Sequence, residues 1–213
     1  MITRTSWFRR AALFSLATLC TLAGCKRKSD EAFEILTPPA PSIQTLPRHW
    51  QAPEFQLTER TGRTVTLQEL RGIVWVADFF YTSCPGPCPA MTSRLSSLDQ
   101  RTRAFDDVRL LSISIDPIKD TPEVLQAYAQ KFAASERWLF LTGDKQRIFD
   151  LANRGFKLAV TDQGGTPAEP ITHSTKLVLV DKNGTVRGFY EGTSEEESKR
   201  IIGDIEKLRK ESR

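Results

Sequence analysis

Cysteine and histidine are scarce in this sequence, which has 4 cysteines and 2 histidines among its 213 residues. Cys20 and Cys25 fall in the first 25 residues, so only Cys84 and Cys88 remain for a folded domain. A domain held together by several disulfides is therefore excluded. A structural zinc site is disfavoured as well, because such sites use four protein ligands and no third cysteine is available. A single cysteine pair in so sparse a chain indicates reactivity or metal binding.

The chain also lacks a strong excess of charge. It contains 30 basic and 26 acidic residues, and three of the arginines lie in the first 25 residues, which contain no acid. The rest of the chain, with 27 basic and 26 acidic residues, is close to neutral. No basic stripe with interleaved aromatic residues is present, so we expect no nucleic-acid binding.

The N-terminal apolar run is too short to favour a membrane span, but residues 1–25 have the pattern of an export signal. Arg9 and Arg10 precede an apolar stretch over residues 11–19, and LAGC at 22–25 resembles the lipobox of bacterial lipoproteins. This predicts cleavage of the signal and lipidation of Cys25. The alternative is an uncleaved membrane anchor. Both place the domain outside the cytoplasm and tethered to a membrane, and a lipoprotein facing the periplasm is favoured.

A tether is predicted to separate the lipid from the domain. Residues 26–52 contain four prolines and little hydrophobic periodicity, which favours an extended, mobile segment. His49, near its end, is expected to be exposed rather than a ligand. Residues 53–210 are then predicted to form a single folded domain.

Hydrophobic periodicity predicts the elements of this domain. Gly155 is predicted to close the third helix, and Asn183-Gly184 to turn a hairpin. The order predicts an α/β domain with a thioredoxin-like fold, in which helices flank both faces of a central mixed sheet and a β-hairpin closes it. The predicted strands are 53–57, 64–67, 73–80, 108–115, 138–141, 175–180 and 185–190, and the predicted helices are 90–103, 122–134, 145–154 and 195–210.

The two domain cysteines lie in the turn between the buried strand 73–80 and the helix that follows it. If Cys88 opens this helix, Cys84 can present its sulfur on the same side. Prolines between and after the cysteines stiffen the loop, and the helix N-terminus is expected to favour the thiolate form. Such a pair can hold a soft metal or cycle with a disulfide.

Several motifs in one order give the chain a family resemblance. They are FFYTSCPGPCP at 79–89, SIDPIKDTP at 114–122, LTG at 141–143, HST at 173–175 and LVDKNG at 179–184. Across residues 53–210 they resemble the Sco/SenC family of copper-binding, thioredoxin-like proteins that serve cytochrome c oxidase assembly. The resemblance implies a copper ion held by Cys84, Cys88 and His173. It also implies a partner that receives copper, either an oxidase subunit or another cuproprotein. Gly86 and Thr172 stand where acidic residues are common in the family, which bears on affinity or partner recognition.

The residues themselves are compatible with copper. Two thiolates and an imidazole form a soft donor set that favours Cu(I), while Cu(II) would recruit an additional oxygen ligand. An incomplete ligand set suits a transfer site better than a permanent structural ion. A lone histidine at a strand start is usually bonded to nearby backbone, so it is the resemblance that puts His173 beside the cysteines.

Thiol–disulfide chemistry is the alternative. One helical turn separates the Cα atoms of Cys84 and Cys88 by about 6 Å, within disulfide range. Asp78 lies six residues before Cys84 in an otherwise apolar strand, the offset of the buried aspartate of thioredoxins. It would either assist proton transfer or be structural, as a hydrogen-bonded strand residue or one at an edge facing water. Against a general thioredoxin, the CxxC spacing is absent and Ser83 occupies the position of its tryptophan.

Two further interpretations are weaker. Thr82 is the one loose similarity to a peroxiredoxin, and a copper or redox sensor without catalysis is a third possibility for the cysteine pair. Asp116 and Asp120 are interpreted as structural, at a strand end and a helix cap. The favoured function is therefore a copper chaperone rather than an enzyme, with a thiol–disulfide reductase as the enzymatic alternative.

Overall fold

The computed structural model of the chain describes residues 45–163, 165–166 and 170–211. The predicted signal and the lipidation site Cys25 lie outside the described residues. Within the described part, no helix combines the length and the apolar character that crossing a bilayer requires.

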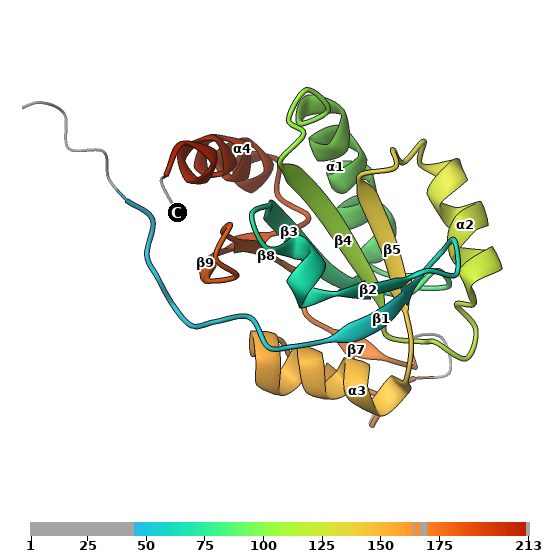
Figure 1. The fold of residues 1–213 in the computed structure, drawn as a ribbon. Helices are drawn as coiled ribbons and strands as arrows, with labels where there is room; N and C mark the ends of the chain where they lie inside the picture. Colours follow the sequence, from blue (N-terminus) through green and yellow to red (C-terminus); the bar gives the residue numbers. More distant parts are fainter. Residues whose placement is uncertain (1–44, 164, 167–169, 212–213) are drawn as a thin grey trace, which may run out of the picture. The chain divides into compact units, whose positions relative to one another are not determined.

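Seven strands form one mixed sheet (Figure 1). In spatial order they are β2 (Thr64–Thr66), β1 (Gln56–Glu59), β5 (Trp138–Thr142), β4 (Val108–Ser114), β3 (Val74–Phe80), β8 (Lys176–Val180) and β9 (Val186–Glu191). The β3–β4 and β4–β5 pairs are parallel, whereas the remaining pairs of this sheet are antiparallel. The parallel centre is fed by helical crossovers, and the β8–β9 hairpin closes one edge, as predicted.

Helices cover both faces of this sheet (Figure 1). On one face lie α1 (Cys88–Arg101), α2 (Pro122–Lys131) and α4 (Glu195–Lys210). On the other lie α3 (Lys145–Asp150) and a π-helical segment, η2 (Leu151–Phe156). Two successive side chains of β3 point to opposite faces of the sheet. Phe80 packs against Tyr128 of α2, while Phe79 packs against Phe156 of η2. The predicted thioredoxin-like arrangement is confirmed.

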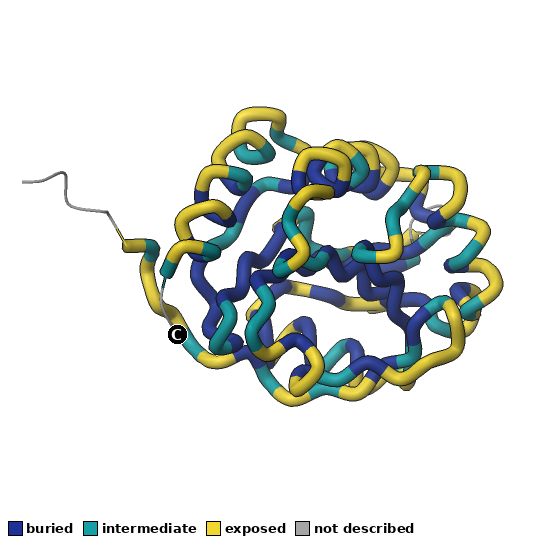
Figure 2. Tube along the Cα trace, turned by 45° about the horizontal axis from the view of Figure 1, so that its top comes forward, coloured by how far each residue is buried: buried dark blue, intermediate teal, exposed yellow. Residues whose placement is uncertain are grey.

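The central strands form the core because both of their faces are covered. All seven residues of β3 are buried, which explains why this strand is apolar at every position except Asp78 rather than alternating. Figure 2 shows the buried residues concentrated along the central strands, with exposed residues on the outer sides of the helices. The strand that leads into the cysteine turn is therefore rigidly packed.

The third helix ends differently from the prediction. Regular α-helix stops at Asp150, η2 follows, and Lys157 takes the left-handed conformation (φ 57°) that Gly155 was expected to supply. Gly155 is required for another reason, because a Cβ at this position would lie 2.5 Å from Cγ of Pro53. The patterns also missed a 3-10 helix, η1 (Leu67–Leu70), and a two-stranded sheet of β6 (Val160–Thr161) and β7 (Thr172–His173).

The segment before β1 contacts the domain. Buried Arg187 of β9 donates to the carbonyl oxygens of Leu46 and Pro47, at 2.7 and 2.8 Å. The same guanidinium pairs with Asp181 at 2.9 Å and with Glu211 at 2.7 Å. His49 is exposed, as expected. Part of the predicted tether is thus bound along β9.

Candidate metal centre

Three potential ligands converge at one end of β3. The Sγ atoms of Cys84 and Cys88 and a ring nitrogen of His173 all lie within 4.8 Å of one another. Nε2 of His173 is 3.1 Å from the sulfur of Cys88 and 3.9 Å from that of Cys84. Within the described ranges, this is the one group of three or more His, Cys, Asp or Glu residues whose ligand atoms gather so closely. The structure therefore brings together the three residues predicted to bind metal.

The cysteines belong to what we call the sulfur half of the site, residues 81–89. Cys88 is the first residue of α1, and the amide of Cys84 donates to the carbonyl oxygen of Tyr81 at 3.2 Å. Both cysteines are free thiols and are only 6% and 1% exposed, respectively. Pro85 and Gly86, between them, are exposed. The sulfurs thus lie beneath a surface turn.

Asp120 holds the sulfur half in place, a role that sequence reasoning missed. Its carboxylate is fully buried and accepts hydrogen bonds from the Thr82 amide (3.0 Å), the Thr82 hydroxyl (2.5 Å) and the Ser114 hydroxyl (2.5 Å). Helix α2 is capped by Thr121, as the sequence predicted, and the side chain of Thr121 accepts from the amide of Val124. Asp120 is structural, as expected, but its hydrogen bonds go to the cysteine turn and to β4 rather than to that cap. A buried carboxylate with three donors fixes the backbone two residues before Cys84.

His173 belongs to the imidazole half, residues 159–161 and 172–174. Val160 pairs with His173 across the short β6–β7 ladder, and the Ser174 amide donates to the Ala159 carbonyl at 2.9 Å. The side chain of Asn153 in η2 holds β6 by donating to the Val160 carbonyl (2.9 Å) and accepting from its amide (3.0 Å). His173 itself is half-buried. A two-residue ladder and one amide side chain position this ligand.

The tautomer of His173 suits metal binding. Nδ1 lies 3.0 Å from the carbonyl oxygen of Ser174. A carbonyl oxygen only accepts, so Nδ1 carries the proton and Nε2 presents its lone pair to the two sulfurs. The backbone of the imidazole half therefore orients the ring as ligand-bearing histidines require.

The expectation of a low thiol pKa at the helix N-terminus is wrong for Cys88. Burial raises the pKa of the Cys88 thiol well above its ordinary value, and the nearby Cys84 thiol raises it further. Loss of solvation outweighs the helix dipole at a side chain that is 1% exposed. Cys88 without metal is protonated at neutral pH, and metal binding must displace its proton.

Asp78 is buried in β3, the strand that leads into the cysteine turn. It accepts a hydrogen bond from the Ser112 hydroxyl at 2.6 Å, and Ser112 in turn accepts one from Nε1 of Trp138 at 2.9 Å. Burial raises the pKa of Asp78 to about 7, although the Ser112 hydrogen bond opposes this shift. A negative charge here also disfavours ionisation of Cys88. A buried aspartate of raised pKa is what the thiol–disulfide alternative requires.

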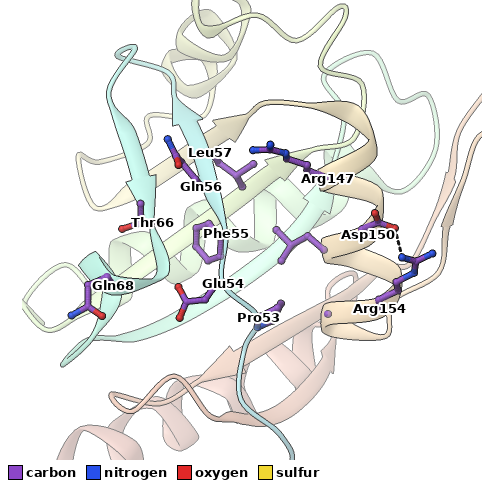
Figure 3. A pocket seen from close by; sticks show the side chains of 12 residues that line it. Pro53, Glu54, Phe55, Gln56, Leu57, Thr66, Gln68, Arg147, Asp150 and Arg154 are labelled. Atoms are coloured by element: carbon purple, nitrogen blue, oxygen red, sulfur yellow. Dashed lines mark ion pairs between the residues drawn. The ribbon is translucent and has the colours of Figure 1, made fainter.

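A hollow of about 790 Å³ lies apart from this chemistry (Figure 3). Its walls come from residues 53–57, Thr66 and Gln68 on one side and from α3 and η2 on the other. Arg147, Asp150 and Arg154 line its helical wall, and the last two form an ion pair of 3.5 Å. No cysteine or histidine lines it, so the candidate metal site remains the cysteine–histidine cluster.

Comparison with known proteins agrees with the geometry. The profile of the SCO1/SenC family matches residues 44–210. A SCO1 protein homolog of Bacillus subtilis is 33% identical over 162 residues, which are 75% of this chain and 83% of that protein.

Two solved structures extend the comparison. A SCO1/SenC family lipoprotein from Bacillus anthracis superposes with a TM-score of 0.69 at 34% identity, covering 75% of this chain and 95% of that one. Bradyrhizobium japonicum ScoI with copper bound gives a TM-score of 0.63 at 22% identity, covering 74% and 99%. The second likeness shows the fold alone.

Proposed function

The chain belongs to the SCO1/SenC family, and from that membership and the geometry of its site we propose that it is a membrane-tethered copper metallochaperone. It binds one copper ion as cargo through Cys84, Cys88 and His173. It passes the ion to a protein partner, an oxidase subunit or another cuproprotein, during cytochrome c oxidase assembly.

The observation that carries this proposal is the convergence of two sulfurs and one correctly oriented imidazole nitrogen within 4.8 Å. Two thiolates and an imidazole satisfy the preference of Cu(I) for soft ligands. Two other metal-binding roles, a site for a hard cation and a structural zinc site, fit the ligand set less well. Hard cations such as Mg²⁺ prefer oxygen ligands, and structural zinc requires a fourth protein ligand. Copper held in Bradyrhizobium japonicum ScoI adds support from a protein of the same fold.

Cargo transfer places two demands on the chain that the geometry meets. Both cysteines must be reduced, and both are free thiols here. One ligand must be reachable by the partner, and His173 is more exposed than either cysteine. Release by ligand exchange at His173 follows from this difference in exposure.

The tether and its anchor complete the proposal. Lipidation of Cys25 would hold the domain at an extracytoplasmic membrane surface. Residues 26–52 would form the tether, with their last part attached to the domain through Leu46, Pro47 and Trp50, and residues 53–210 would form the copper-binding domain. The similar Bacillus anthracis protein is a lipoprotein, which supports this arrangement.

A thiol–disulfide reductase is the second candidate, and Asp78 is the observation in its favour. The sulfurs of Cys84 and Cys88 lie within 4.8 Å, so a local movement of the exposed turn would bring them to bonding distance. Asp78, with its pKa near 7, would then serve proton transfer during exchange.

Anaerobic copper titration distinguishes the two. The reduced chain without its first 25 residues is titrated against a competing Cu(I) chelator, beside the Cys84→Ser and His173→Ala variants. We expect one equivalent bound tightly by the unsubstituted chain and sharply weakened binding in both variants. Weak binding that is indifferent to His173, in a chain that still reduces a test disulfide, would refute the chaperone and favour the reductase. In that case Asp78→Asn should slow the exchange.

A further inference from the structure

A groove of about 510 Å³ borders His173. Its apolar lining comes from Trp50, Leu158 and Phe189, and two lysines, Lys157 and Lys176, also line it. We infer that this groove docks an acidic segment with an aromatic side chain, belonging to the protein that receives copper. The inference rests on the proposed chaperone function and adds the chemistry of the partner to it.

The groove is built into the fold before any partner arrives. Nε1 of Trp50 donates to the carbonyl oxygen of Gly155 at 2.8 Å, which fixes the indole on η2. The Trp50 ring lies 5.9 Å from the ring of Phe189, and the ammonium of Lys157 lies 3.9 Å above the same indole. A preformed apolar groove binds an aromatic side chain without the cost of ordering its own walls.

Charge selects an acidic partner. Among the described residues that line the groove there are two lysines and no carboxylate. Lys176 is partly neutralised by Glu191 at 3.2 Å, whereas the contact of Lys157 is with an aromatic face. A carboxylate beside the inserted aromatic side chain would meet Lys157 directly. Rim charges of this kind act mainly on the association rate and on partner selection.

The groove adjoins the copper ligands, and from this we identify its occupant as the protein that receives copper. His173 lines the groove and also faces both sulfurs, so a segment seated there contacts the least buried ligand of the site. Copper remains Cu(I) throughout: its bonds to Cys84, Cys88 and His173 break, and two bonds to acceptor thiolates form. The protons lost by the acceptor thiols are taken up by the two freed cysteines.

A membrane surface fits the groove less well. Trp50 is only half-exposed, packed between Lys157 and Phe189, whereas anchoring at a bilayer requires aromatic side chains that project outward. A concave, cationic groove suits a projecting side chain with an adjacent carboxylate.

Matched acceptor peptides test the inference. All carry the same dithiol head, Cys-Gly-Gly-Gly-Cys, and differ in the tail: Asp-Phe-Asp-Glu, Asp-Ser-Asp-Glu or Lys-Phe-Lys-Lys. The full chain is reconstituted in phosphatidylcholine vesicles and loaded with Cu(I), and transfer rates are followed by stopped flow. The Lys157→Glu variant is run beside Lys210→Glu, which makes the same charge change at the exposed end of α4.

We expect the acidic aromatic tail to be loaded about tenfold faster than the basic one, with the advantage shrinking as salt increases. The tail with serine should be slower than the tail with phenylalanine. Lys157→Glu should abolish or reverse the preference while copper stoichiometry and affinity stay unchanged, and Lys210→Glu should leave the preference intact.

Other outcomes overturn the inference. Equal rates for all tails, with copper bound normally, would refute the groove but leave the chaperone standing. Failure of the unsubstituted chain to bind copper would refute the chaperone itself. Loss of the preference in vesicles of equal phosphatidylcholine and phosphatidylglycerol, when it is present in pure phosphatidylcholine vesicles at the same salt concentration, would show a membrane in the groove. Self-association of the unsubstituted chain that Lys157→Glu removes would show a second copy there.

Discussion

The two halves of the metal centre are supported very differently. The sulfur half joins a seven-residue buried strand to a fourteen-residue helix. Asp120 fastens it to β4 by accepting from the amide and the hydroxyl of Thr82 and from the hydroxyl of Ser114. The imidazole half consists of two-residue strands, and it is secured by two hydrogen bonds from the side chain of Asn153, which lies seven residues before Val160 in η2. Local stability follows the extent of buried packing, so the histidine side should open first. The centre combines a fixed pair of soft ligands with one ligand that can yield.

The largest expected effect concerns the stability of the chain and comes from Asp78, which is buried in the strand that leads into the sulfur half. Asp78 has an ordinary pKa of 3.8 when unfolded and of about 7 when folded. Between these values the folded state holds a proton that the unfolded state has released, so the free energy of unfolding falls as pH rises. Asp78→Asn should remove a penalty of up to roughly 4 kcal/mol above pH 7.

Urea unfolding of the reduced, metal-free chain at about pH 5 and about pH 8 measures this difference. The variant should gain stability relative to the unsubstituted chain at the higher pH. Identical pH dependence in the two proteins would show that Asp78 ionises freely in the fold.

The next prediction compares the loss of one copper ligand from each half of the site. Cys88→Ser should weaken Cu(I) binding more than about 100-fold, beyond the loss that follows removal of an outer-shell partner. His173→Ala should cost less, about 10- to 100-fold, because two thiolates still bind Cu(I). Competition with a Cu(I) chelator ranks the variants. Ser174→Ala serves as control, since the oxygen that accepts from Nδ1 belongs to the backbone. A larger loss at His173 than at Cys88 would reverse our ordering of the two halves.

A smaller effect separates the support of the sulfur half from its ligands. Asp120→Asn places amide hydrogens against the donors of Thr82 and Ser114, so the unfolding free energy should fall by about 1–3 kcal/mol. Copper affinity should fall about tenfold as the turn loosens. Asp116→Asn is the matched control, because Asp116 lies in the same loop after β4 but its carboxylate pairs with Lys119 rather than with Thr82. If the Asp120→Asn chain were less stable but bound copper with unchanged affinity, Asp120 would contribute to folding and not to copper binding.

The smallest effect concerns the support of the imidazole half. Asn153→Ala removes both side-chain bonds to Val160 and should cost about 1 kcal/mol of local stability. Hydrogen exchange should accelerate in residues 159–161 and 172–174, while the sulfur half keeps its protection. Arg154→Ala, a neighbouring exposed change, provides the control. Faster exchange in both halves together would mean that they open as one unit.

Sequence reasoning recovered what local patterns encode. The run 73–80, Pro122 after Thr121 and Asn183-Gly184 each specify their element within a few residues, so the strands, the helix start and the hairpin turn were predicted. Cys84 and Cys88 could be paired because a single turn separates them. His173 came from family resemblance, since nothing in its neighbourhood reveals a sulfur 85 residues earlier.

The features that were missed depend on tertiary contacts. Asp120 bonds to a residue 38 positions away, and its own neighbours suggest a helix cap. β6 and β7 are two residues long, too short for any periodicity. The raised pKa of Cys88 reflects burial by the whole domain, which outweighs the local helix N-terminus from which a low value was expected.

Arg187 has a consequence for how the chain can vary. Two of its acceptors are the carbonyl oxygens of residues 46 and 47, which every amino acid supplies. Saturation mutagenesis should therefore find Pro47 permissive and Arg187 intolerant, while Leu46 should accept other apolar side chains because it also packs against the core. The composition at Pro47 can change while the attachment of the segment to β9 stays fixed.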